Sequence, residues 1–280
     1  MDDSKVITGV IVGITGSSGF IGSNLIRHLK ECGYTIMPLK RGFSLELAGK
    51  CDIIVNLAGA SINRRWSSNY KVILKRSRIE TTRSVVDAIN MSKKVKLLIS
   101  ASAVGIYQYD NNHINRESDP FYGDDFLANL CKEWEKEAFN AMGCARVVVA
   151  RLGLVISESG GVLEKMILPA KYGIAVILGS GAQMISWIML EDLLRAFSHI
   201  ISNETITGPV NITAPNSISN RDLTALIAKR ERSLFKVRVP ESILTFIMGE
   251  ASVIITKGQR VIPEKLKKSG FTFKYPTFSI

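Results

Sequence analysis

Residues 14–22 read Ile-Thr-Gly-Ser-Ser-Gly-Phe-Ile-Gly, and they join an apolar strand predicted over 10–15 to an amphipathic helix predicted over 20–32. The three glycines, spaced three residues apart, allow a tight turn, leave room for a pyrophosphate and permit close contact between helix and strand. Amide groups at the start of the helix would hold the phosphates. The predicted contacts are Gly16, Ser17, Ser18, Gly19, Phe20, Ile21 and Gly22.

A glycine-rich turn can also be a simple packing device, so the order of the following elements matters. A second strand is predicted over 34–39 and a third over 52–57, which gives the strand–helix–strand order that a dinucleotide site requires. The third strand runs into a second small-residue turn, where Leu57, Ala58 and Gly59 are predicted cofactor contacts. Two turns are therefore expected to face one crevice.

The chain has 280 residues, enough for one α/β domain and a smaller lobe, and 46% hydrophobic residues argue against disorder. Its first residues show no basic n-region or cleavage site, and the apolar run 243–256 is interrupted by Glu250 and too short to span a bilayer. We therefore expect a soluble, cytoplasmic protein without a membrane partner.

The net charge of +11 is spread along the chain without a nucleic-acid-reading motif. We interpret it as a solvated basic surface that partly serves anionic phosphates, and we expect no nucleic-acid partner. The four cysteines, Cys32, Cys51, Cys131 and Cys144, are widely spaced, which favours free thiols. No Cys/His pair has metal-ligand spacing, so no metal site is expected.

Strand and helix signals alternate through the first half of the chain, which predicts a parallel sheet covered on both faces. Further helices are expected over 68–91, 124–142 and 219–229, and further strands over 94–101, 145–152 and 209–213. The predicted fold is α/β: a Rossmann-like, doubly wound parallel sheet with a small C-terminal α/β substrate lobe. We assign residues 1–155, with segments near 182–230, to the sheet domain, and residues 156–181 and 231–280 to the lobe.

Over nearly its whole length the chain resembles the extended short-chain dehydrogenase/reductases of the NAD(P)-dependent epimerase/dehydratase family, in an atypical branch. Besides the two turns, the matching segments are Arg65-Trp66, Ser77-Arg78-Ile79, 100–107, Trp134-Glu135, Arg151-Leu152-Gly153, 179–181, Ser186-Trp187-Ile188, Asp192 and 258–263. The resemblance implies a nicotinamide cofactor and leaves the substrate unnamed. It also places Ser100 and Arg151 among the cofactor contacts.

The end of the second predicted strand indicates which nicotinamide cofactor is used. NAD-preferring folds of this kind place a carboxylate there, but this chain has Lys40 and Arg41. A guanidinium binds a 2′-phosphate bidentately, so we predict NADP in preference to NAD, with Arg41 selecting and Lys40 assisting. Alternatively, both are ordinary surface cations. Only ten residues separate Arg41 from Asp52, where relatives place a further strand, so the adenine wall is expected to be incomplete.

Typical relatives carry a serine after the fourth strand and a Y-x-x-x-K pair on the next helix. Ser102 matches the serine, but Phe126 and Leu130 occupy the positions of the tyrosine and lysine. Because neither can exchange a proton, the usual mechanism is unavailable. The predicted catalytic residues are Ser102 and Tyr107.

Other polar and aromatic residues have weaker claims to a role. Tyr122 and Lys132 are further candidates for the missing acid. Arg64 and Arg65 either hold an anionic substrate group or lie in a solvated loop. Trp66 and Trp187 are expected to pack, and Gln183 lies at a position near the substrate lobe.

Two functions stay open. One is an NADP-dependent oxidoreductase or epimerase-like enzyme acting on a small substrate of unknown identity, for example a nucleotide-linked one. The other is a non-catalytic NADP(H)-binding sensor or scaffold. A homodimer is a possible assembly in either case.

Overall fold

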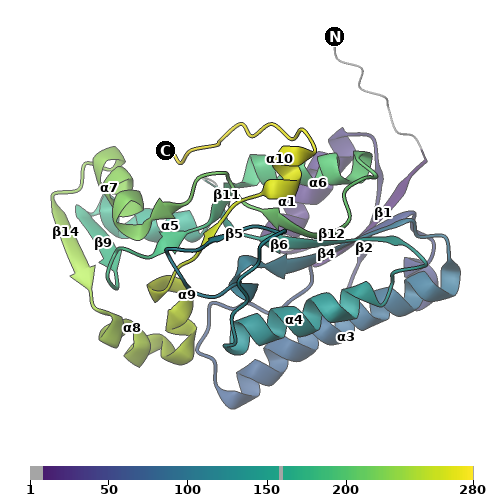
Figure 1. The fold of residues 1–280 in the computed structure, drawn as a ribbon, viewed down its shortest axis with the longest axis horizontal. Coiled ribbons are helices and arrows are strands. Elements are labelled where there is room, and N and C mark those ends of the chain that lie inside the picture. Colours follow the sequence, from purple (N-terminus) through teal and green to yellow (C-terminus); the bar gives the residue numbers. More distant parts are fainter. Residues whose placement is uncertain (1–8, 158–159, 280) are drawn as a thin grey trace, which may run out of the picture.

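Six parallel strands form the main sheet in the order β12-β6-β4-β3-β1-β2 (Figure 1). The computed structural model describes residues 9–157 and 160–279. The strands are β1 (Ile11–Thr15), β2 (Thr35–Leu39), β3 (Ile53–Asn56), β4 (Leu97–Ala103), β6 (Arg146–Leu152) and β12 (Gly208–Ile212). β4 begins three residues later than predicted, and Lys94 and Lys96 are exposed at the start of this segment.

Helices cover both faces of this sheet, as the sequence predicts for a doubly wound fold (Figure 1). On one face, α1 (Phe20–Glu31) and α6 (Leu190–Ser202) pack through residues such as Leu25 and Phe197. On the other, α2 (Leu45–Ala48), α3 (Ser68–Ser92) and α4 (Phe126–Phe139) pack through residues such as Val85 and Ala138. The two apolar layers fix the sheet between helices, and its loop-bearing ends are left for a ligand.

The second half of the chain adds short elements beside the sheet (Figure 1). The strands are β7 (Leu154–Ser157), β8 (Gly160–Gly161), β9 (Ile174–Leu178), β10 (Met184–Ile185), β11 (Trp187–Met189), β13 (Ile218–Ser219), β14 (Phe235–Val239) and β15 (Arg260–Val261), and β15 pairs with β5 (Ile114–Asn115). The helices are α5 (Val162–Lys171), α7 (Asn220–Arg230), α8 (Glu241–Met248), α9 (Val253–Thr256) and α10 (Glu264–Lys268), with the short 3-10 turns η1 (Val104–Ile106) and η2 (Gly249–Ser252). The predicted division of the chain into two units stays a prediction.

The segment between β2 and β3 contains one short helix, α2, capped by the Ser44 hydroxyl, and adds no strand. β2 is therefore the outer strand of the sheet as described. The prediction about the N-terminus falls on residues outside those described. None of the helices in the described ranges is long and apolar enough to cross a membrane.

Candidate functional site

The glycine turn after β1 is held so tightly that side chains at two positions would collide with backbone. Gly16 has φ +64°, and a Cβ there would lie 2.8 Å from the carbonyl carbon of Leu57. A Cβ on Gly22 would overlap the carbonyl oxygen of Gly16. Gly16 and Gly22 are therefore required by the close approach of α1, the turn and the loop after β3.

The start of α1 presents its amide groups without a competing cap. Gly19 is the N-cap residue, so no side chain accepts a hydrogen bond from the first turn, and no acidic residue lies in that turn. Ser18 and Gly19 are exposed. Free amide groups and the positive end of the helix dipole together favour an anion at this place.

The two predicted turns are tied to one another by Thr15. Its hydroxyl donates to Asn56 Oδ1 at 2.7 Å and accepts hydrogen bonds from the amides of Leu57 at 3.1 Å and Ala58 at 3.2 Å. Asn56 donates onward to Thr82 at 2.8 Å and to Ser100 at 3.3 Å. These bonds bring the ends of β1, β3 and β4 together, with Ser100 fully buried beneath them.

Lys40 and Arg41 lie beside the glycine turn. The parallel register pairs Thr15 with Leu39. Lys40 and Arg41 therefore follow the carboxyl end of β2, beside the carboxyl end of β1 that Gly16 follows. Both are exposed. The sheet register therefore joins the predicted phosphate cradle and the predicted selector of the 2′-phosphate, which lie some two dozen residues apart in the chain.

A buried ion pair lies under the predicted catalytic residues. Glu135 on α4 accepts hydrogen bonds from Arg151 Nε and Nη2, both at 2.8 Å, and from the Ser102 hydroxyl at 2.7 Å. Arg151 also donates to the hydroxyls of Tyr107 at 2.8 Å and Tyr122 at 3.1 Å. Ser102 and Tyr107 are thus joined through two charged residues, and we call these five residues the buried cluster.

Burial and charge act in opposite directions on the cluster's ionisable groups. Burial lowers the pKa of Arg151, but the hydrogen bonds and charge of Glu135 outweigh it and raise this pKa above its usual value. Burial raises the pKa of Tyr107 to about 12, although Arg151 and Asn211 oppose that shift. Tyr107, which donates to Asn211 Oδ1 at 2.6 Å, is therefore a neutral phenol at physiological pH.

Exposure separates the candidates for the missing acid. Tyr107 is 0% exposed, whereas Tyr122 is 42% exposed, and the two rings stack with centroids 6.0 Å apart. Lys132 donates to the Gly123 carbonyl at 2.6 Å. The catalytic roles assigned to Ser102, which is also buried, and to Tyr107 stay predictions, as do the cofactor contacts assigned to Ser100 and Arg151.

Phe126 and Leu130, which the sequence predicts at the positions of the usual tyrosine and lysine, are used for packing. Phe126 meets Trp66 edge-on with ring centroids 5.3 Å apart, and Leu130 is buried in the same cluster. Trp187 packs edge-on against Phe278 at 4.9 Å. Both tryptophans pack, as predicted.

Two further residues singled out from the sequence bind backbone carbonyls of distant segments. Arg65 donates to the carbonyl of Phe246 at 2.9 Å, close to the end of α8, and Arg64 lies over the Tyr70 ring at 5.9 Å. Gln183 donates to the carbonyls of Leu178 and Ile255. In this structure Arg65 and Gln183 therefore bind backbone carbonyls.

Glu135 was not singled out as a site residue from the sequence alone, although a signal for it exists. In α4 the buried positions Leu127, Cys131 and Ala138 recur at helical spacing, and Glu135 falls on the same face. An acid on a buried helix face requires a partner. That rule predicts a buried cation but cannot say that it comes from β6.

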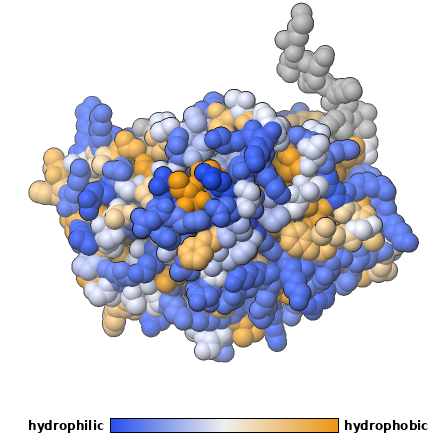
Figure 2. Space-filling view, in the orientation of Figure 1, coloured by the Kyte–Doolittle hydropathy of each residue, from blue (hydrophilic) through white to orange (hydrophobic). Residues whose placement is uncertain are grey.

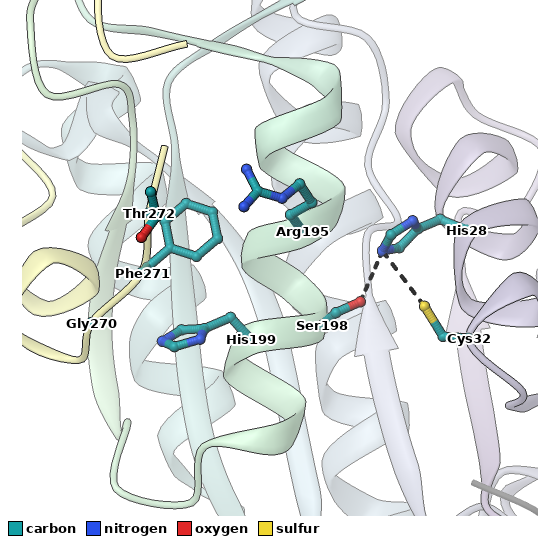
Figure 3. Close-up of a pocket in the computed structure, with 8 residues that line it drawn as sticks. All are labelled: His28, Cys32, Arg195, Ser198, His199, Gly270, Phe271 and Thr272. Carbon is teal, nitrogen blue, oxygen red and sulfur yellow. Dashed lines mark hydrogen bonds between the residues drawn. The ribbon is translucent and has the colours of Figure 1, made fainter. Parts of the chain in front are cut away.

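A separate hollow of about 410 Å³ lies between the ends of α1 and α6 and the segment after α10 (Figure 3). His28 and Cys32 line it from the last turns of α1, which lead into β2. The hollow therefore lies at the amino-terminal ends of the strands, and the glycine turn lies at their carboxyl ends. The four cysteines are free, and no group of three or more potential metal ligands occurs among the described residues.

His28, which lines this hollow, predicts how the stability of the fold depends on pH. Burial lowers the pKa of His28, whose Nε2 lies 2.9 Å from the Ser198 hydroxyl. The unfolded chain then binds protons more readily than the folded one, so stability falls as the pH drops below about 6.5. We expect His28→Gln to reduce this loss in chemical denaturation at pH 7.5 and 5.5. Equal pH dependence in His28→Gln and the parent protein would contradict the assignment.

The chain is similar to known proteins over most of its length. The model of the NAD dependent epimerase/dehydratase family matches residues 12–213, and that of a domain of unknown function, DUF1731, matches residues 239–279. The epimerase family protein SAR0825 of Staphylococcus aureus is 34% identical over 283 residues, covering 94% of each chain.

Two solved structures are similar over almost the whole chain. The human epimerase family protein SDR39U1 (isoform 2), crystallised with NADPH, superimposes with a TM-score of 0.90 at 29% identity, covering 96% of both chains. A nucleoside-diphosphate sugar epimerase from Corynebacterium glutamicum gives a TM-score of 0.79 at 29% identity, covering 96% of this chain and 56% of the other.

Proposed function

This chain belongs to the NAD-dependent epimerase/dehydratase family, and from that premise we propose that it binds NADP(H) and transforms a small carbonyl or hydroxyl compound. The substrate would be anionic, for example nucleotide-linked, and no nucleic acid would be involved. The observation that carries the proposal is the pairing of the uncapped α1 turn with Lys40 and Arg41 at one edge of the sheet.

The residues present fit such a cofactor. A Cβ at Gly16 or Gly22 would collide with backbone, so glycine at both positions lets the turn, the start of α1 and the loop after β3 approach closely at the site where the amides would meet a phosphate. The Gly19 amide donates to the Gly16 carbonyl at 2.9 Å, so the residues that follow it in the first turn of α1 would hold the pyrophosphate through backbone amides, and Arg41 would hold the 2′-phosphate. When bound, the nicotinamide would supply the chemistry of hydride transfer. The human relative crystallised with NADPH supports the choice of NADP(H).

The prediction that tests the cofactor concerns Arg41. We expect Arg41→Ala to lower the affinity for NADPH about tenfold, since a charge-assisted hydrogen bond to phosphate is lost, while NADH affinity is unchanged. Nicotinamide fluorescence titration measures both constants. Arg27, on α1, is also an exposed arginine, and Arg27→Ala is the control. If the ratio of NADPH affinity to NADH affinity is unchanged in Arg41→Ala, Arg41 does not select the 2′-phosphate.

The buried cluster supports a specific route for the proton. Because Tyr107 is fully buried, we assign the role of proton donor to Tyr122. Its ring is partly exposed, and its hydroxyl accepts a hydrogen bond from Arg151. The guanidinium would stabilise the phenolate formed when that proton leaves. Glu135 would hold Arg151 and Ser102 in place and would not meet the substrate. Tyr122→Phe should then abolish turnover and keep NADPH binding.

A second function is favoured by Phe126 and Leu130 at the positions of the usual tyrosine and lysine. It is a sensor or scaffold whose partner affinity depends on the NADP(H) ratio. NADPH consumption with any member of a carbonyl panel, lost in Tyr122→Phe, would exclude the sensor. Partner binding that differs between NADP and NADPH, with no turnover on the panel, would exclude the enzyme.

A further inference from the structure

The lobe carries a group of apolar side chains that face solvent. Tyr172 and Leu234 are each 81% exposed, and Phe235 on β14 is 65% exposed. Ile174 on β9 and Val237 on β14 are also exposed. We call these five residues the lobe patch. A patch of large apolar residues on a surface marks a place that another molecule covers.

The fold makes the lobe patch continuous. β14 pairs with β9 in parallel, which sets Phe235 beside Ile174 on one face of the two-stranded sheet. The amides of Leu234 and Phe235 both donate to the Gly173 carbonyl at 2.9 Å, so Tyr172 and Leu234 flank the same end. On the opposite face Ala175 of β9 is fully buried, whereas its register partner Lys236 on β14 is exposed, so only the β9 side of that face is packed within the protein.

Exposed cations lie close in the chain to the residues of the lobe patch. Lys171, Lys229, Arg232 and Lys236 are all exposed, and they come from the same turns and strands as the apolar residues. Figure 2 shows apolar residues mixed with hydrophilic ones along the margin where β14 lies. The whole chain carries a net charge of +11, so it is attracted as a body to anionic surfaces.

We propose that the lobe patch docks on the surface of an anionic lipid bilayer. Protruding aromatic and aliphatic side chains would enter the interfacial layer, and the exposed cations would meet anionic headgroups. The attachment is peripheral and uses no spanning helix. It differs from the expectation, drawn from the sequence, that the protein has no membrane partner.

Charge argues against a second copy of the chain as the occupant. If β14 paired antiparallel with β14 of another copy, registers that keep the apolar faces together would set Lys236 opposite Arg238 or opposite itself. Like charges directly opposite one another destabilise such pairing. An anionic bilayer satisfies the apolar and the cationic residues at once.

The test uses full-length protein and sedimentation with vesicles of phosphatidylcholine alone or mixed with phosphatidylglycerol. We expect binding to the anionic vesicles, weakened by salt, and little binding to the neutral ones. The double variant Leu234→Ser/Phe235→Ser should lower the partition coefficient about tenfold or more. Lys171→Gln, at the exposed lysine next to Tyr172, should lower it about fivefold.

Met91→Ser, at an apolar side chain 70% exposed near the end of α3, should leave vesicle binding unchanged. No binding to anionic vesicles, or equal binding by Leu234→Ser/Phe235→Ser, would overturn the proposal. Gel filtration of the same variants identifies the rival occupant: a dimer of the parent protein that dissociates in the double variant, without vesicle binding, would assign the patch to a second copy. NADPH affinity should stay constant throughout, which keeps this test independent of the cofactor site.

Discussion

Glu135→Ala is expected to lower the free energy of unfolding by about 3–5 kcal/mol, the usual cost of leaving a buried charge without its partner. Arg151 is 1% exposed, and Glu135 provides both oxygens for its guanidinium. The tyrosine hydroxyls that remain near Arg151 accept hydrogen bonds but carry no compensating charge. Urea unfolding followed by circular dichroism measures the loss.

The same helix provides the control for this prediction. Glu133→Ala removes an exposed partner of Lys75 and should cost no more than about 1 kcal/mol. The double variant Glu135→Leu/Arg151→Met, which removes both charges, should recover much of the stability lost in Glu135→Ala. If Glu135→Ala behaves like Glu133→Ala, the ion pair does not hold this part of the fold together.

Gly16→Ala is expected to cost about 2–5 kcal/mol of folding free energy, because left-handed backbone strain and steric overlap add together. The Cβ would lie 2.8 Å from the Leu57 carbonyl carbon, and neither the turn nor the loop can move without separating β1 from β3. NADPH binding should be lost with it. Denaturation and fluorescence titration of the same sample test both effects.

Gly143→Ala separates the two contributions. Gly143 has φ +96°, and an added Cβ would meet nothing within 4 Å, so only the backbone strain applies. Its cost should stay near 1–2 kcal/mol, taken as about the left-handed penalty alone, and NADPH affinity should be unchanged. Equal losses in Gly16→Ala and Gly143→Ala would show that close packing at the turn is unimportant.

Much of the fold could be predicted from local patterns. The apolar strand before Gly16 and the amphipathic helix after it are set by residues a few positions apart, so their order is visible in the chain. The boundaries of α1 and β1 agree with the prediction to within one residue. Helix α2, with only four residues, is too short for helical periodicity to reveal.

The sequence by itself determined the βαβ order, the glycines of the turn, the cations after β2 and the loss of the Y-x-x-x-K pair, because each is a property of adjacent residues. The tertiary structure alone decided that Glu135 neutralises Arg151 and that Tyr107 is buried whereas Tyr122 is exposed. It also decided that Tyr172 and Leu234 lie in one patch. Those outcomes depend on which residues from distant segments share a face, and on how much water each retains. Burial and pairing are properties of the packed chain, so no local pattern contains them.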